Sequence, residues 1–96
     1  MIAEFTVIPI GAGESISPYV AECLKIVRAS GLRHELTATC TIVEGELDDV
    51  MRTMVECHRK VRSLSPRVVT SIRLDDREGE SNAIERKVRS VEEKSR

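Results

Sequence analysis

The sequence predicts an α+β sandwich in which two helices cover one face of a four-stranded antiparallel sheet. Two observations predict this class. Segments rich in β-branched residues, typical of strands, alternate along the chain with segments whose apolar residues recur every three to four positions, typical of helices. Their order is strand, helix, strand, strand, helix, strand, and a further helical segment follows near the end of the chain.

The first strand and the first helix are predicted from composition and from residues that typically begin or end such elements. Residues 2–10, IAEFTVIPI, favour a strand, and Pro9 indicates that it ends there or lies at an edge. Residues 18–30 are predicted to be helical, because Ser17 before Pro18 is typical of a helix start and Gly31 is a natural stop. The apolar stripe of this helix consists of Val20, Cys23, Leu24 and Val27.

The middle of the chain combines a predicted hairpin with a second helix and a last strand. Residues 33–44, RHELTATCTIVE, have the length of two short strands that turn near Ala38 and Thr39. Residues 46–64 show helical periodicity, and acidic residues lie in the first turn, where the helix dipole favours them. Residues 67–75, RVVTSIRLD, form the last convincing strand.

A third helix is predicted for residues 83–94, where Asn82 and Glu85 could cap its first turn. Its apolar stripe is narrow. The whole order corresponds to the ferredoxin-like βαββαβ pattern with an appended helix, so residues 1–96 form one domain. If Phe5 and Val7 face the helices, the open face of the sheet is expected to carry Glu4, Thr6, Ile8, Thr41, Val43, Val69 and Ser71.

Length and charge restrict the classes of partner. A domain of 96 residues has a thin core, which favours association with further copies of itself. The 15 basic and 16 acidic residues nearly cancel, which argues against a dominant role on nucleic acid or on a membrane surface. The three cysteines form no C-x-x-C motif, which predicts buried, reduced thiols. No stretch of residues is apolar enough to span a membrane, so we expect a cytoplasmic protein.

The turn between the first strand and the first helix, GAGESI at residues 11–16, raises the question of a phosphate loop. Ile16 stands where a dinucleotide site has its third glycine, and no lysine follows as in a Walker loop. Glu14 would also repel a phosphate. Since glycine and serine are what such a turn needs, we predict a structural turn that could line a pocket for an uncharged or cationic ligand.

Catalytic constellations are missing from the sequence. No Ser-His-Asp arrangement and no metal-ligand spacing can be assembled, and His58 on the stripe of the second helix is interpreted as a packed or hydrogen-bonded core residue. Two aromatic residues are too few for stacking on RNA bases. Glu44 differs from the other acids, because it ends a strand close to Thr39 and Thr41 and is free to point into a cleft.

Several motifs in the same order resemble the small thiamine-binding, YkoF-type proteins. They are TVIPIG, SISPYVAECLKIVRASGL, LTATCTIVEGELDDV, a helix carrying His58, and RVVTSIRLDDR, and together they cover about residues 1–78. The resemblance implies a ferredoxin-like fold, assembly into tetramers through sheets, and binding of thiamine or a related pyrimidine. It implies neither established catalysis nor a metal or cofactor.

Transferred position by position, the resemblance predicts a ligand site between the end of the first strand and the T-x-x-E-G-E block. Glu44 is the expected principal anchor, because a carboxylate and threonine hydroxyls match the amine and ring nitrogens of an aminopyrimidine. The supporting residues are Thr41, Ser15, His58, Pro9, Gly11 and Thr39.

We therefore expect a non-enzymatic small-molecule binding protein that forms a homo-oligomer, a tetramer through sheet faces and edges that would bury Ile8, Val43 and Val69. Two alternatives remain open. One is an oligomeric regulatory or interaction module with a vestigial pocket, and the other is an enzyme of pyrimidine or phosphate-ester metabolism.

Overall fold

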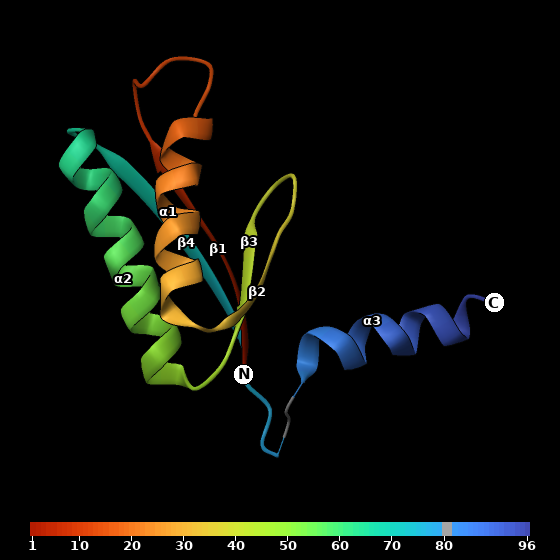
Figure 1. Ribbon diagram of the computed structural model, residues 1–96. Coiled ribbons are helices and arrows are strands. Elements are labelled where there is room, and N and C mark those ends of the chain that lie inside the picture. Colours follow the sequence, from red (N-terminus) through yellow and green to blue (C-terminus); the bar gives the residue numbers. More distant parts are fainter. Residues whose placement is uncertain (80–81) are drawn as a thin grey trace.

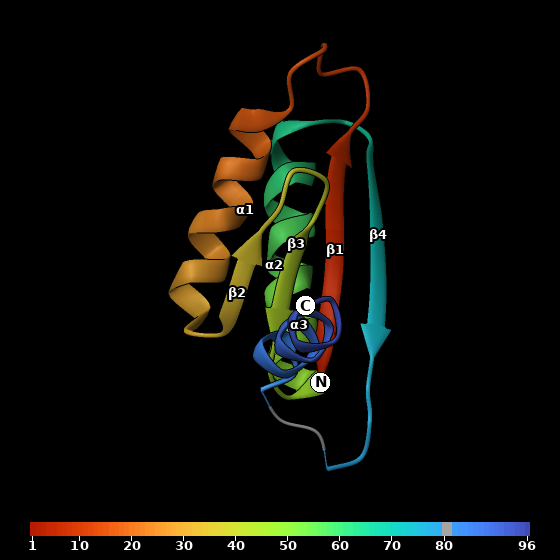
Figure 2. The same ribbon diagram turned by 90° about the vertical axis from the view of Figure 1, so that its right-hand side faces the viewer.

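The computed structural model describes residues 1–79 and 82–96. The elements are β1 (Ile2–Pro9), α1 (Ser17–Ser30), β2 (Arg33–Leu36), β3 (Thr41–Glu44), α2 (Leu47–Leu64), β4 (Val68–Asp75) and α3 (Ala83–Lys94). The strands pair antiparallel in the order β2-β3-β1-β4. Helices α1 and α2 cover one face of this sheet, and α3 lies on the other side (Figures 1 and 2). The predicted ferredoxin-like fold is confirmed, with element bounds within one residue of those expected outside the hairpin.

The core lies between the sheet and the two covering helices. Strand β1 contributes Ala3, Phe5 and Val7, alternate residues that all point to the same face. Helix α2 contributes most of the remaining buried side chains, because its apolar residues recur with helical periodicity. They are Val50, Met54, Cys57 and Val61, each at most 1% exposed.

The open face of the sheet differs from the expected one on β3. Thr41 pairs with Phe5 and Val43 pairs with Ala3, so both face the helices, and both are buried. Ile42 and Glu44 take the open face instead. The expectation that Val43 would be available for sheet packing was wrong, because it is fully buried in the core.

The starts of two helices also differ from expectation. Helix α1 begins one residue early, with Ile16 rather than Ser17 at the N-cap position and no side-chain cap. The side chain of Asn82 likewise makes no cap hydrogen bond at the start of α3. Its backbone lies in the left-handed region, at φ 55°, and the N-terminal N–H groups of α3 are bound by another residue, described below.

Candidate functional site

The main cavity lies on the helix-covered side of the sheet, between α1 and the β2–β3 hairpin. It has a volume of about 470 Å³. Its lining comes from residues 5–8 of β1, from most of residues 16–24 at and after the start of α1, and from residues 36–41 of the hairpin. Figure 1 shows the hairpin rising beside α1 with its tip free. We call this cavity the hairpin pocket.

The walls of the hairpin pocket are apolar and uncharged. Helix α1 contributes Val20 and Leu24, and Ile16 lies just before its first turn. Phe5 of β1 and Leu36 of β2 add further apolar surface. None of the described residues that line the pocket carries a charge. Polar groups come from serine and threonine hydroxyls and from two thiols, so the pocket suits a ligand with an uncharged ring and a few hydrogen-bonding groups.

Thr41 provides a polar group inside this apolar lining. The residue is 7% exposed, its hydroxyl makes no hydrogen bond to another described residue, and that oxygen is not sealed off from solvent. A ligand in the pocket could therefore pair with this hydroxyl without breaking a hydrogen bond within the protein. Thr39 also lines the pocket, from the exposed tip of the hairpin.

The hairpin tip is held by the side chain of Thr37. Its hydroxyl donates to the carbonyl of Cys40 at 2.9 Å and accepts from the N–H of Cys40 at 3.1 Å. The backbone N–H of Thr37 also donates to the same carbonyl, at 2.9 Å. These bonds close the turn locally, so one wall of the pocket keeps its shape without a large number of packed side chains.

Two of the three cysteines border the hairpin pocket, and all are free thiols. Cys40 is half-buried, and its thiol lies 3.7 Å from a carboxylate oxygen of Glu4. Cys23 is buried against α2, where its thiol and that of Cys57 each point to the other residue's backbone carbonyl. The hydrogen bond with Cys23, together with burial, raises the pKa of the Cys57 thiol well above its ordinary value.

Glu44 lies outside the hairpin pocket, on the opposite face of the sheet. Its carboxylate accepts hydrogen bonds from the backbone N–H groups of Ala83 and Ile84, the second at 3.3 Å, and so caps the N-terminus of α3. Because Thr41 and Glu44 are three residues apart on one strand, they point to opposite faces. The structure therefore does not bring the expected anchor and Thr41 together.

The remaining expected site residues are also spread apart. The ring of His58 bonds the hydroxyl of Thr70 at 2.6 Å and links α2 to β4, as expected of a hydrogen-bonded core histidine. Pro9, Gly11 and Ser15 belong to the end of β1 and the following turn and do not line the hairpin pocket. Of the seven expected ligand-binding residues, only Thr39 and Thr41 line it.

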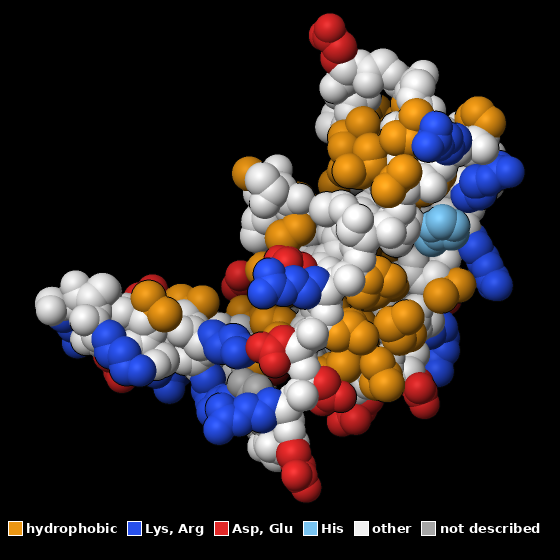
Figure 3. Space-filling view, turned by 180° about the vertical axis from the view of Figure 1, so that it is seen from behind, with side chains coloured by type: hydrophobic (Ala, Val, Ile, Leu, Met, Phe, Trp, Pro, Cys, Tyr) orange, Lys and Arg blue, Asp and Glu red, His pale blue; other side chains and the backbone are white. Residues whose placement is uncertain are grey.

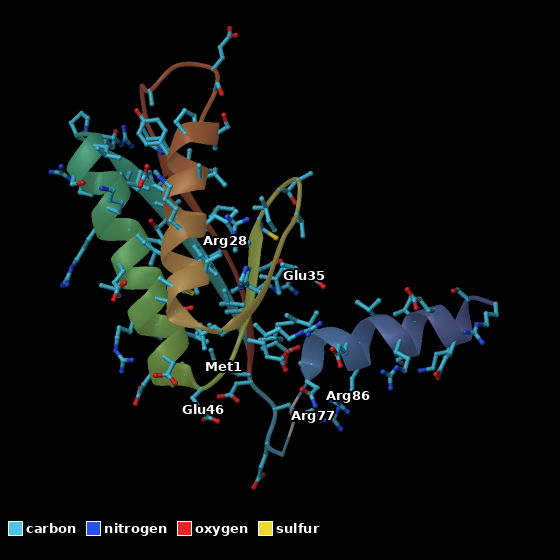
Figure 4. The ribbon with its side chains drawn as sticks, in the orientation of Figure 1. Met1, Arg28, Glu35, Glu46, Arg77 and Arg86 are labelled. Carbon is cyan, nitrogen blue, oxygen red and sulfur yellow. The ribbon has the colours of Figure 1, made fainter. Side chains whose placement is uncertain are left out.

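The T-x-x-E-G-E block has a structural explanation at its centre. Gly45 exchanges two hydrogen bonds with Met1, at 2.8 and 3.0 Å, which extend the pairing of β3 with β1. A Cβ atom at Gly45 would lie 2.7 Å from a methyl group of Leu32, so a larger residue there would require the Leu32 side chain to shift. Figure 4 shows Glu46 pointing away from the sandwich.

Residues missed by the sequence reasoning are mainly the apolar lining. The periodicity places Val20 and Leu24 on the helix stripe and Leu36 in a strand, and only the fold shows that they surround a cavity. Ile16 belongs to the turn at residues 11–16, which the sequence predicts could line a pocket. One usable signal was present. Thr37, Thr39 and Thr41 alternate along the hairpin.

No cluster of three or more His, Cys, Asp or Glu residues that could hold a metal ion occurs among the described residues. In the same part of the chain, no helix combines the length and apolar character required to cross a membrane.

Comparison with known families gives a match over nearly the whole chain. The family model described as "Thiamine-binding protein" matches residues 3–92. A UPF0045 protein of Methanocaldococcus jannaschii is 36% identical over 93 residues, which cover 97% of this chain and 93% of the relative. The UPF0045 protein YqgV of Bacillus subtilis is 38% identical over 96 residues, covering 94% of this chain and 92% of the relative.

Solved structures agree in fold. The crystal structure of a hypothetical protein from Methanocaldococcus jannaschii has a TM-score of 0.90 at 36% identity, covering 96% of this chain and 95% of that one. A Thermotoga maritima protein, assigned provisionally to thiamine biosynthesis or salvage, has a TM-score of 0.83 at 22% identity, with coverage of 94% and 96%. The second match shows a likeness of fold.

Proposed function

Because the chain belongs to the thiamine-binding protein family, we propose that it binds thiamine or a related aminopyrimidine in the hairpin pocket, without catalysing a reaction. The observation that carries the choice of site is the unpartnered hydroxyl of Thr41 in an apolar cavity of about 470 Å³. That volume lies in the range of about 300 to 1,000 Å³ typical of small-molecule pockets.

The chemistry of the lining supports one orientation of the ligand. An aminopyrimidine ring is neutral and planar, and it carries an amine donor beside ring-nitrogen acceptors, which hydroxyl groups can match. The cationic thiazolium half would lose its hydration in an uncharged cavity. We therefore place the pyrimidine inside the pocket, at Thr41 and Thr39, and the thiazolium at its open mouth.

The composition of the lining favours binding without catalysis. The described lining of the hairpin pocket contains no histidine and no carboxylate, the side chains that most often act as general acid or base, and its thiols belong to Cys23 and Cys40. We also propose that the protein acts in the cytoplasm, where its free thiols stay reduced.

A matched pair of threonine variants tests this function by calorimetric titration with thiamine and with its pyrimidine half. Thr41→Val keeps the shape and removes the free hydroxyl. A neutral hydrogen bond contributes about 0.5 to 1.5 kcal/mol, so the affinity should fall about two- to ten-fold.

Thr53→Val is the control, because Thr53 is also buried but its hydroxyl donates to the carbonyl of Asp49 within α2. This variant should bind as the parent does. If the parent gives no heat with either compound, the interaction-module alternative takes the lead. If both variants bind equally well, the site is not at Thr41.

A further inference from the structure

Strand β1 extends further along the sheet than its neighbour β3. Pairing between the two ends where Phe5 lies opposite Thr41, whereas β1 continues to Pro9 and is paired with β4 over its whole length. Strand β3 begins only at Thr41 because the hairpin turns at residues 37–40, where a backbone hydrogen bond of 2.9 Å closes the turn. Beyond Phe5, one edge of β1 therefore has no described strand beside it (Figure 2).

The backbone groups of Val7 point towards this unpaired edge. In an antiparallel strand, the N–H and C=O of successive residues point alternately to the two sides. The N–H of Ile10 donates to the carbonyl of Arg67 beside β4 at 2.8 Å, and Met1 exchanges two hydrogen bonds with Gly45 after β3. Even-numbered residues along β1 therefore bond towards β4, and odd-numbered residues, Val7 among them, point towards the β3 side.

Both backbone polar groups of Val7 are left without a protein partner. Continuing the register would place Val7 opposite Thr39, but Thr39 lies in the hairpin turn and pairs with no residue of β1. Within the described part of the chain, neither the N–H nor the C=O of Val7 forms a hydrogen bond. Val7 is only 6% exposed, and backbone groups of buried residues are nearly always paired in native proteins. This donor and acceptor are therefore available to a ligand, which would break no bond of the sheet.

The hairpin pocket reaches the edge of β1 at which Val7 is unpaired. Its lining includes four consecutive residues of the strand, residues 5–8, although successive side chains point to opposite faces of a sheet. A cavity bordered by consecutive strand residues meets the strand along its edge, where the backbone is presented. Thr39 and Thr41 line the same cavity from the hairpin, and Val20 lines it from α1. The free N–H and C=O of Val7 therefore border the pocket.

The number of free backbone groups limits the class of ligand. Pro9 is the next odd-numbered residue of β1 and has no N–H, so the unpaired edge offers a single donor. An extended peptide that adds to a sheet edge uses a row of main-chain hydrogen bonds. This edge is too short for such a strand, whereas one donor beside one acceptor matches one side of a planar heterocyclic ring.

The charge around this edge favours an uncharged ring. The hairpin tip, residues 37–40, consists of two threonines, an alanine and a cysteine. Figure 3, which views the molecule from behind, shows the projecting hairpin tip free of charged side chains, while such side chains gather on α3 and around its base. A neutral aminopyrimidine ring loses less hydration in such surroundings than an ion does.

We propose that the backbone of Val7 binds the amino group of the pyrimidine and the ring nitrogen next to it. The N–H of Val7 donates to that ring nitrogen, and the C=O of Val7 accepts a hydrogen bond from the amine. The ring then continues the pairing of β1 where β3 has ended, and the second ring nitrogen is left for the hydroxyl of Thr41. This inference rests on the proposed function and adds the group that selects the amino substituent.

The proposed pairing predicts which change to the ligand weakens binding. An oxo group in place of the amine would set its oxygen against the carbonyl oxygen of Val7, so that two acceptors face each other. Calorimetry should therefore show binding about ten-fold to a hundred-fold weaker for the oxo analogue of thiamine than for thiamine itself. Equal affinities would overturn the inference, because hydroxyl groups alone can match either substituent.

A pair of proline variants tests the N–H of Val7 by the same titration. Val7→Pro removes this N–H and spares the ladder with β4, so the affinity for thiamine should fall about two- to ten-fold. Ile72→Pro is the control, because Ile72 is an even-numbered residue of β4 and its N–H points to the outer edge of the sheet. The control should bind as the parent does, and equal binding by both variants would count against the inference. If Val7→Pro fails to fold, hydrogen exchange on the parent decides instead.

Hydrogen exchange followed by NMR first tests the geometry without a ligand. The amide of Val7 should exchange about ten-fold or more faster than the amides of Phe5 and Ile8, whose N–H groups are bonded to β3 and β4. Saturating thiamine should bring the exchange of Val7 to the rate of these neighbours. Equal protection of the three amides in the free chain would overturn the inference.

The same experiment separates this inference from the proposed function. If the parent binds thiamine while the exchange of the Val7 amide does not change, the backbone pairing is wrong and the proposed function is unaffected. A parent that binds neither thiamine nor its pyrimidine half contradicts both.

Discussion

Thr41 and Glu44 show how the alternation of side chains along a strand decides which face of the sheet a residue lies on. The two lie on the four-residue strand β3, one toward the helices and one toward α3. The alternation of strand side chains was available from the sequence. The partner of Glu44 was not, because Ala83 lies 39 residues further along the chain.

Cys40 is the thiol that the structure leaves accessible, since Cys23 and Cys57 are 5% and 0% exposed. We predict that iodoacetamide modifies Cys40 first in the native protein, because a buried thiol with a raised pKa, such as Cys57, forms little thiolate. Saturating thiamine should slow the modification, since Cys40 lines the hairpin pocket. Peptide mass spectrometry over time measures both effects.

The unfolded protein is the control for this experiment, and there all three cysteines should react at similar rates. Equal rates in the native protein would show that the helices do not protect Cys23 and Cys57. If saturating thiamine leaves the rate of Cys40 modification unchanged, the ligand binds away from the hairpin tip.

At the scale of elements, α3 depends on a cap supplied by another element. We predict that Glu44→Ala lowers the free energy of unfolding by about 1 kcal/mol, as other losses of a helix cap do. For a domain of this size the melting temperature should fall by about 4 to 8 °C. Amide exchange in the first turns of α3 should accelerate, as measured by NMR.

Glu46→Ala is the matched control, because Glu46 lies two residues away, is exposed, and makes no side-chain cap hydrogen bond at the start of α2. It should leave the exchange of α3 unchanged. If both variants have the same effect, the link between Glu44 and α3 does not stabilise the helix.

The elements themselves were largely predictable from local signals. Helix α2 was identified by its apolar periodicity and its first-turn acids, and the β2–β3 hairpin by its length and its threonines. The direction of α3 was not predictable, because it depends on Glu44 and Arg33, which lie far from it in the sequence. The same limit applies to the hairpin pocket, whose walls come from three separate segments.

The whole molecule places the hairpin pocket and helix α3 on opposite faces of one sheet. The helix-covered side encloses the hairpin pocket, while the open side carries α3 (Figure 2). Strand β3 takes part in both, with Thr41 at one end and Glu44 at the other. Sequence motifs that look continuous along the chain therefore serve two different surfaces.

The most direct test of the central claim is an NMR titration of the ¹⁵N-labelled chain with thiamine. If thiamine binds in the hairpin pocket, the largest amide shift changes fall in residues 16–24 and 36–41, the two segments that face each other across it. Residues 44–49 should change little. The largest changes at residues 44–49 or on α3, or no changes at millimolar thiamine, would contradict it.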